Sequence, residues 1–155
     1  MARTKRTTRR QAARRRRTVP SASGGLSPTQ LAAYFRAKLA AELGPHNVKR
    51  LLDRGEPVVV VDVRSADGYQ AGHIPGARSL PFEQLPERSR ELPRDQEIIT
   101  YCWNATCFLS TKAAFVLASK GYRVKEMVGG IDEWNAAGFP VEQSAAELAT
   151  ATASS

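Results

Sequence analysis

The chain has 155 residues, of which 42% are hydrophobic and 25% are charged, which suits one compact domain with an apolar core. No apolar run approaches the roughly 18–20 residues that a membrane-spanning helix requires, so we expect a soluble protein with no membrane partner. The formal net charge of +8 would indicate a nucleic-acid-binding protein, but the positive charge is concentrated at one end of the chain.

Residues 1–25 form a basic arm that holds nine of the 23 lysines and arginines and no acidic residue. The rest of the chain has 14 basic and 15 acidic side chains and is close to neutral. Because the arm has little apolar surface to bury, we expect it to be disordered. The positive charge of the arm predicts at most binding to an acidic partner or a nucleic acid. Without an apolar core it is not a secretory signal, whereas an organelle transit peptide stays open for a eukaryotic source.

A helix is predicted directly after the arm, because Ser27 and Pro28 are typical of a helix N-terminus. Apolar side chains then recur every four residues, at Leu31, Phe35, Leu39 and Leu43. This spacing is typical of an amphipathic helix, which Gly44 and Pro45 should end. A second short helix is expected over residues 47–53.

Three apolar segments predict a parallel α/β sheet. Residues 58–63 are a β-branched run without polar alternation, typical of a strand that helices cover on both faces. Residues 97–101 and 123–128 are the other two strands, and residues 111–120 between them are helical. Strand, helix and strand in this order form a βαβ unit with a right-handed crossover.

Shorter elements complete the expected domain. We predict an edge strand around residues 78–80, a turn at Gly129-Gly130 and a short helix over residues 131–137. Residues 143–155 are expected to be a flexible tail, so residues 26–142 are the folded domain. A monomer is the default expectation.

Both cysteines of the chain, Cys102 and Cys107, lie in one segment. Two are too few for a disulfide-stapled secreted scaffold, which favours a cytoplasmic location. Cys102 directly follows the strand that ends at Tyr101, where the ends of parallel strands and the starts of helices form a ligand crevice. Backbone N–H groups there favour a thiolate and can lower its pKa from about 8.5 toward roughly 3.5–7.5. A nucleophile is therefore predicted, with an inert buried thiol as the alternative.

For Cys107 two roles stay open: packing, or a resolving thiol that closes a disulfide with Cys102 on oxidation. The two cysteines are not spaced as C-x-x-C, and with one nearby histidine they do not predict a zinc site. We therefore expect neither a metal nor another cofactor.

Separated motifs resemble the rhodanese family over roughly residues 45–142. They are Asp62-Val63-Arg64, Tyr69-Gln70-Ala71-Gly72-His73-Ile74-Pro75-Gly76-Ala77, Ile99-Thr100-Tyr101-Cys102, Gly129-Gly130-Ile131-Asp132-Glu133-Trp134 and Gly138-Phe139-Pro140-Val141. The resemblance implies a mostly parallel sheet of about five strands flanked by helices on both faces. It also implies a sulfurtransferase whose catalytic Cys102 alternates between thiolate and persulfide. The sulfur would come from thiosulfate or another persulfide and pass to cyanide, a thiol or a protein acceptor.

The segment that follows, here called the cysteine loop, departs from the family pattern. It consists of Cys102, Trp103, Asn104, Ala105, Thr106, Cys107 and Phe108. Many relatives read C-x-x-G-x-R-S, whereas Ala105, Cys107 and Phe108 stand here at the glycine, arginine and serine positions. The missing arginine removes a cation that would hold thiosulfate. Two alternatives therefore stay open. One is a non-catalytic interaction or regulatory domain. The other is a phosphatase or arsenate reductase, which a loop longer by two residues resembles but the missing arginine disfavours.

Other motif residues are expected to support the site. We predict that Asp62 and Arg64 bind each other or nearby backbone, and that His73 braces its loop, with a catalytic role as the less favoured alternative. Trp103 either lines the donor pocket or packs against the domain. Trp134 and the two glycines before it are expected to serve packing and the turn.

Overall fold

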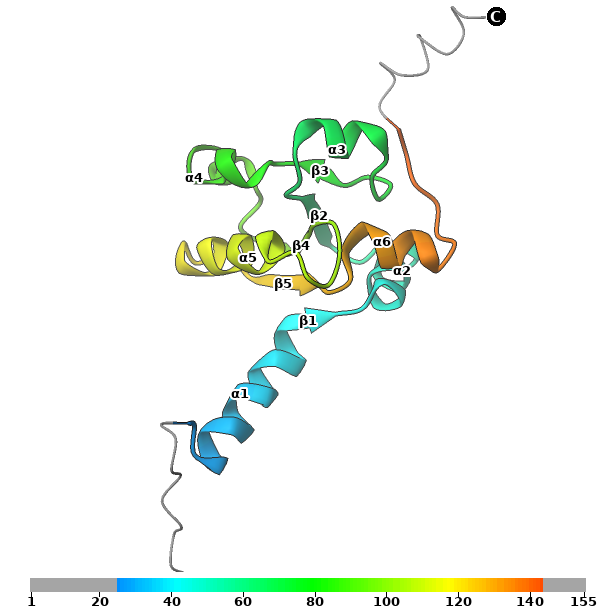
Figure 1. The fold of residues 1–155 in the computed structure, drawn as a ribbon. Coiled ribbons are helices and arrows are strands. Elements are labelled where there is room, and N and C mark those ends of the chain that lie inside the picture. The colour runs from blue at the N-terminus through cyan, green and yellow to red at the C-terminus, as the bar shows by residue number, and fades with distance from the viewer. Residues whose placement is uncertain (1–24, 144–155) are drawn as a thin grey trace, which may run out of the picture.

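The computed structural model describes residues 25–143 (Figure 1), so the predicted arm and tail lie almost wholly outside the described residues. The helices are α1 (Pro28–Ala41), α2 (Pro45–Asp53), α3 (Ala66–Ala71), α4 (Leu85–Arg88), α5 (Leu109–Ser119) and α6 (Gly130–Ala136), with short 3-10 turns η1 (Phe82–Gln84) and η2 (Ser89–Glu91). The strands are β1 (Glu42–Leu43), β2 (Val58–Asp62), β3 (Arg78–Ser79), β4 (Glu97–Tyr101) and β5 (Val124–Met127). No helix in this range is long and apolar enough to span a membrane.

The five strands form one parallel sheet in the order β1-β5-β4-β2-β3, which confirms the predicted fold class. Strand β4 is central, pairing with β2 along its whole length and with β5 on its other side. Helix α5 connects β4 to β5 as the predicted crossover. Because all strands run in one direction, their carboxyl ends meet at one edge of the sheet, where Cys102 follows β4.

Both faces of the sheet are buried, which explains the uninterrupted valine run of β2. Val59 and Val61 belong to a cluster that includes Leu117 of α5. The alternate residue Val60 faces a second cluster that includes Trp134 of α6. Helices therefore cover both faces (Figure 1), as a strand without polar alternation predicts.

The structure departs from the sequence prediction at the end of the first helix, at α3 and at the start of α5. The first helix ends at Ala41, and Leu43 lies instead in β1, opposite Met127 of β5. Helix α3 was not predicted, although Ser65 caps it by accepting a hydrogen bond from the Gly68 N–H at 3.3 Å. Helix α5 begins at Leu109, two residues before the predicted start.

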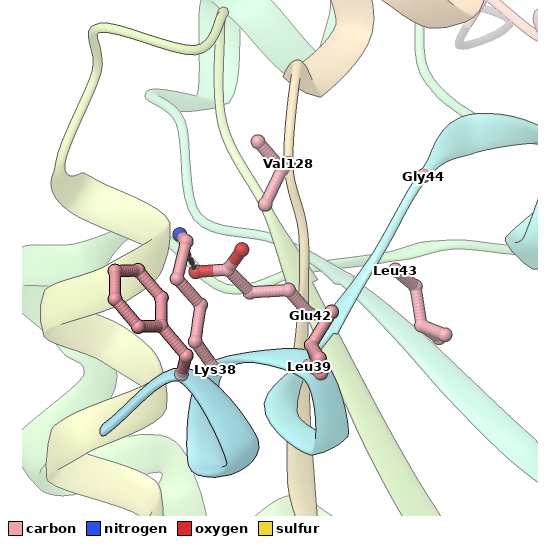
Figure 2. Close-up of a pocket in the computed structure, with 7 residues that line it drawn as sticks. Lys38, Leu39, Glu42, Leu43, Gly44 and Val128 are labelled. Carbon is pink, nitrogen blue, oxygen red and sulfur yellow. Dashed lines mark hydrogen bonds and ion pairs between the residues drawn. The ribbon is translucent and has the colours of Figure 1, made fainter. Parts of the chain in front are cut away.

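Helix α1 extends away from the rest of the domain, and none of its residues is buried (Figure 1). The predicted apolar stripe is present but uncovered by the described residues, since Leu39 is 83% exposed. The last turn of α1 borders a groove of about 380 Å³ (Figure 2). The groove is lined by Phe35, Lys38, Leu39, Glu42, Leu43, Gly44 and Val128.

Candidate active site

Cys102 lies immediately after the central strand, and only 1% of its surface is exposed. Its Sγ lies 2.9 Å from the carbonyl oxygen of Cys107, to which the thiol donates, and 3.3 Å from Ser110 Oγ. The thiol is therefore enclosed by its own loop and by the first turn of α5.

The cysteine loop is folded on itself by Asn104. The Oδ1 atom of Asn104 accepts hydrogen bonds from the N–H of Thr106 at 3.1 Å and from its hydroxyl at 2.9 Å. The Asn104 carbonyl in turn accepts from the Cys107 N–H at 3.1 Å. This tight turn leaves Ala105, Thr106 and Phe108 exposed and directs the chain into α5.

The start of α6 holds the base of the loop. The backbone N–H groups of Ile131 and Asp132 donate to the carbonyls of Cys102 and Trp103, each at 2.9 Å. This approach requires glycine at position 130, where φ is +58° and an added Cβ would lie 2.4 Å from the Cys102 carbonyl oxygen. The glycine pair predicted as a turn therefore also fixes the strand end that carries the thiol.

The pKa values of the two thiols are shifted in opposite directions from the ordinary value of a cysteine. Burial raises the pKa of Cys102, and the neighbouring Cys107 raises it further, although the contacts of the thiol with the Ser110 hydroxyl and backbone act the other way. Burial opposes ionisation of Cys107 too, but hydrogen bonds from Cys102 and from the N–H groups of Leu109 and Trp103 outweigh it and lower the Cys107 pKa. The sequence led us to expect the lowered pKa at Cys102. Instead, N–H groups of the loop favour Cys107, while a carbonyl faces Cys102.

Cys107, rather than Cys102, reaches a cavity of about 100 Å³ between the loop, α1 and the edge of the sheet. The cavity is lined by Lys38, Glu42, Asn104, Ala105, Cys107, Phe108, Thr111, Glu126, Val128 and Gly129. Its charged groups are two carboxylates and one lysine, and Lys38 is already hydrogen bonded to Glu42 (Figure 2). No arginine lines this cavity.

Asp62, the last residue of β2, and Arg64 form a buried ion pair beside the Tyr101 hydroxyl. Arg64 Nη2 lies 2.6 Å from Asp62 Oδ2 and also donates to the Gly72 carbonyl at 2.7 Å. The hydroxyl of Tyr101 donates to Asp62 Oδ2 at 2.6 Å and accepts from the Ile74 N–H at 3.2 Å. Burial and the Asp62 charge raise the pKa of Tyr101, which keeps this hydroxyl protonated as a donor.

His73 and Trp103 both pack against this frame. The His73 ring stacks on Tyr69 with 3.7 Å between centroids, and its Nδ1 lies 2.9 Å from the Tyr69 carbonyl oxygen. The geometry is that of a loop brace. Trp103 stacks beneath the Arg64 guanidinium at 4.5 Å yet stays 41% exposed, so it both packs and lines the surface beside the loop.

Two residues that the sequence analysis missed contact the site, Ser110 of α5 and Glu126 of β5. The Ser110 hydroxyl lies between Cys102 Sγ and Glu126 Oε1, at 2.7 Å from the latter. No sequence motif joins Ser110 and Glu126, because only the βαβ crossover brings them together. Within residues 25–143, no three histidine, cysteine or acidic side chains gather as a metal site.

A parallel five-stranded sheet with a cysteine loop after its central strand defines the class of fold, and the chain matches the Rhodanese-like domain family over residues 44–137. The chain belongs to this family. It is 42% identical over 96 residues to the HTH-type transcriptional regulator Rv0324 of Mycobacterium tuberculosis, a match to 62% of this chain but only 42% of the regulator.

The chain is also similar to proteins named as sulfurtransferases and to proteins of known structure. The thiosulfate sulfurtransferase GlpE of Pseudoalteromonas translucida is 40% identical over 88 residues, which cover 56% of this chain and 81% of that enzyme. The crystal structure of the BH2092 protein from Bacillus halodurans superimposes with a TM-score of 0.68 at 36% identity, over 76% of this chain and 88% of that chain.

Proposed function

We propose that this domain is a sulfurtransferase or sulfur carrier that holds a persulfide on Cys102. The observation that carries the proposal is the position of Cys102, at the carboxyl end of the central strand of a rhodanese-like sheet. The similarity to GlpE supports the same chemistry. The acceptor would be a thiol, cyanide or a protein.

The reaction divides one transfer into two displacements. In the first, the Cys102 thiolate attacks the outer sulfur of a donor R–S–SH, a new S–S bond forms on Cys102, and the bond to the donor breaks with release of R–S⁻. In the second, an acceptor nucleophile attacks the outer sulfur and Cys102 leaves as a thiolate. No net oxidation or reduction of the protein is needed over the cycle.

Cys102 is buried and Cys107 lines the cavity in its place, so the loop that carries Cys107 must move before a donor reaches the Cys102 thiol. The exposed tip of the loop, Ala105 to Phe108, is the segment that can move to allow this. The carboxylates of Glu42 and Glu126 would repel the dianion thiosulfate. A persulfide donor with an apolar body suits this cavity better, and Phe108 beside it is exposed.

The mass of the intact protein after incubation with a persulfide donor tests the proposal. We expect a gain of one sulfur, about 32 Da, that a reductant removes. Cys107→Ser keeps Cys102 as the chain's single thiol and should still gain sulfur, whereas the double variant Cys102→Ser with Cys107→Ser should show no gain. Both variants must keep the thermal midpoint close to that of the wild type for the comparison to count. No gain in Cys107→Ser, or none in the wild type with any sulfane-sulfur donor, would disprove the assignment.

A regulatory role is the second candidate, and the similarity to the regulator Rv0324 favours it. In that case the domain would keep the fold while Cys102 stays an inert or redox-responsive thiol. The mass experiment separates the two roles, because a regulatory domain without sulfur chemistry would gain no sulfur from any donor.

A further inference from the structure

A continuous chain of hydrogen-bonding groups leads from the Cys102 thiol to a carboxylate. Cys102 Sγ lies 3.3 Å from Ser110 Oγ, and Ser110 Oγ lies 2.7 Å from Glu126 Oε1. Ser110 is only 2% exposed, so bulk water does not compete for its hydroxyl. Cys102 directly follows β4, and Ser110 and Glu126 belong to α5 and β5, so one βαβ unit brings the three residues together.

The fold holds the middle of this chain in place through Thr100. Its buried hydroxyl donates to the Ser110 carbonyl at 3.1 Å and approaches the Lys125 carbonyl at 3.4 Å, which ties the first turn of α5 to β5. Thr100 and Glu126 are also partners in the β4–β5 register. The carboxylate is further oriented by the Thr111 hydroxyl, which donates to the same Oε1 at 2.9 Å.

The direction of the hydrogen bonds gives the chain a polarity. Ser110 donates its one hydroxyl hydrogen to Glu126, so its oxygen can accept the hydrogen of the Cys102 thiol. That thiol has a second acceptor, the Cys107 carbonyl, but a carbonyl cannot take up a proton at neutral pH. Only the path through Ser110 ends at a base.

We propose that Ser110 is a catalytic residue that passes the Cys102 proton to Glu126. Glu126 acts through Ser110: it positions the Ser110 hydroxyl and is the final proton acceptor. The inference rests on the proposed function and names how its nucleophile is formed. As Cys102 Sγ bonds to the outer sulfur of the donor, its proton moves to Ser110 Oγ while the Ser110 proton moves to Glu126 Oε1. In the second displacement Cys102 leaves as a thiolate and takes this proton back through Ser110, so the charges balance over the cycle.

Other charged groups face Glu126 from each neighbouring element. Lys38 of α1 and Glu42 of β1 line the same cavity, Cys107 reaches it from the loop, and Lys125 on the same strand is paired with Glu97. If Glu126 acted only through its charge, it would disfavour a nearby thiolate, and its removal would make Cys102 more reactive. A proton acceptor predicts the reverse, so the sign of the effect decides between the two roles.

The pH dependence of Cys102 alkylation by iodoacetamide tests the relay. Cys107→Ser serves as the parent, because Cys102 is then the chain's single thiol. We expect the parent to lose little of its rate between about pH 8 and about pH 6, because Glu126 accepts the proton internally. Adding Ser110→Ala or Glu126→Gln should leave a rate that falls about tenfold per pH unit and is about 100-fold lower at the acid end.

Ser119→Ala is the matched control for Ser110→Ala, since it removes an exposed hydroxyl of the same helix that donates to the Phe115 carbonyl, away from Cys102 and Glu126. It should keep the parent profile. Glu126→Gln preserves the shape of the side chain, and an unchanged thermal midpoint shows that the fold is intact. The relay would be overturned if Glu126→Gln kept the parent profile or reacted faster, even if Ser110→Ala changed the profile.

Alkylation needs no sulfur donor, so it tests the relay separately from the proposed function. If the protein gains no sulfur but shows the expected profiles, the proposed function fails and the proton path stands. If it gains sulfur but all variants share the parent profile, the sulfur chemistry stands and the relay is wrong.

Discussion

The two sides of the carboxyl end of β4 treat charge in opposite ways. On the Asp62 side, a buried carboxylate is matched by Arg64 and by the Tyr101 hydroxyl, and the remaining guanidinium hydrogen bond goes to a fixed carbonyl. On the Cys102 side, Glu126 accepts hydrogen bonds from the hydroxyls of Ser110 and Thr111. The Cys102 thiol, which can gain and lose a proton, lies beside Ser110. A balanced buried ion pair builds a frame, whereas groups that can gain and lose protons support reactivity.

Breaking the frame should produce the largest loss of stability. Arg64→Leu leaves the Asp62 carboxylate buried without its cation, so we expect about 3–5 kcal/mol less free energy of unfolding. Urea denaturation with constant m-values would measure it. The double variant Asp62→Asn with Arg64→Leu removes both charges and should recover part of the loss. A loss below about 1 kcal/mol in the single variant would show that water reaches Asp62 and that this side is no rigid frame.

The donor preference should show the next largest effect, because it depends on the missing cation at the reactive side. A charge-assisted contact is worth about 1.5–3 kcal/mol, so the wild type should use thiosulfate roughly 10- to 150-fold less efficiently than an arginine-bearing loop would. We expect higher catalytic efficiency with a persulfide donor than with thiosulfate, and a gain for thiosulfate in Cys107→Arg.

Cys107→Ser is the control for that gain, since it changes the same position without adding charge. A wild-type preference for thiosulfate, with no improvement in the arginine variant, would mean that another cation reaches the donor. Lys38 would then be the group to examine, because it is the lysine that lines the cavity.

The order in which the thiols react should be a smaller effect but a direct one. The Cys107 pKa is lowered and the Cys102 pKa is raised, so at neutral pH the larger thiolate fraction belongs to Cys107. Limited iodoacetamide treatment should therefore modify Cys107 first, as fragment masses would show. Raising the pH should narrow the difference as Cys102 ionises. Initial modification of Cys102 would mean that the loop opens and reverses the surroundings of the two thiols.

Much of this arrangement could be predicted because it depends on local patterns. The β-branched run of β2, the position of Cys102 after a strand and the glycine pair before Trp134 each fix an element without knowledge of distant residues. The edge strand β1 could not be predicted, because two residues show no periodicity and pair only where β5 offers an open edge. Ser65, a residue type favoured at helix N-termini, is a signal in the sequence for α3.

The reactive side was harder to predict than the frame. Asp62 and Arg64 are two residues apart, and their pairing is a local matter. Ser110 and Glu126 lie 16 residues apart and meet through the crossover, while the Cys102 pKa depends on which backbone groups the loop turns toward the sulfur. A helix start after a cysteine predicts N–H groups nearby but does not predict which of two thiols they face.

The smallest effect should come from the exposed ion pair of Lys38 and Glu42, which is the counterpart of the buried pair of Arg64 and Asp62. Both Lys38 and Glu42 are partly open to solvent, at 44% and 28% of side-chain surface, so water and salt screen their attraction. We expect Lys38→Ala to change the thermal midpoint by less than about 2 °C. Thiosulfate use should also change little, because Glu42 already occupies this cation. A shift as large as that of Arg64→Leu would mean that α1 is bound to the domain more tightly than its exposed face indicates, and the contrast between the two ion pairs would then fail.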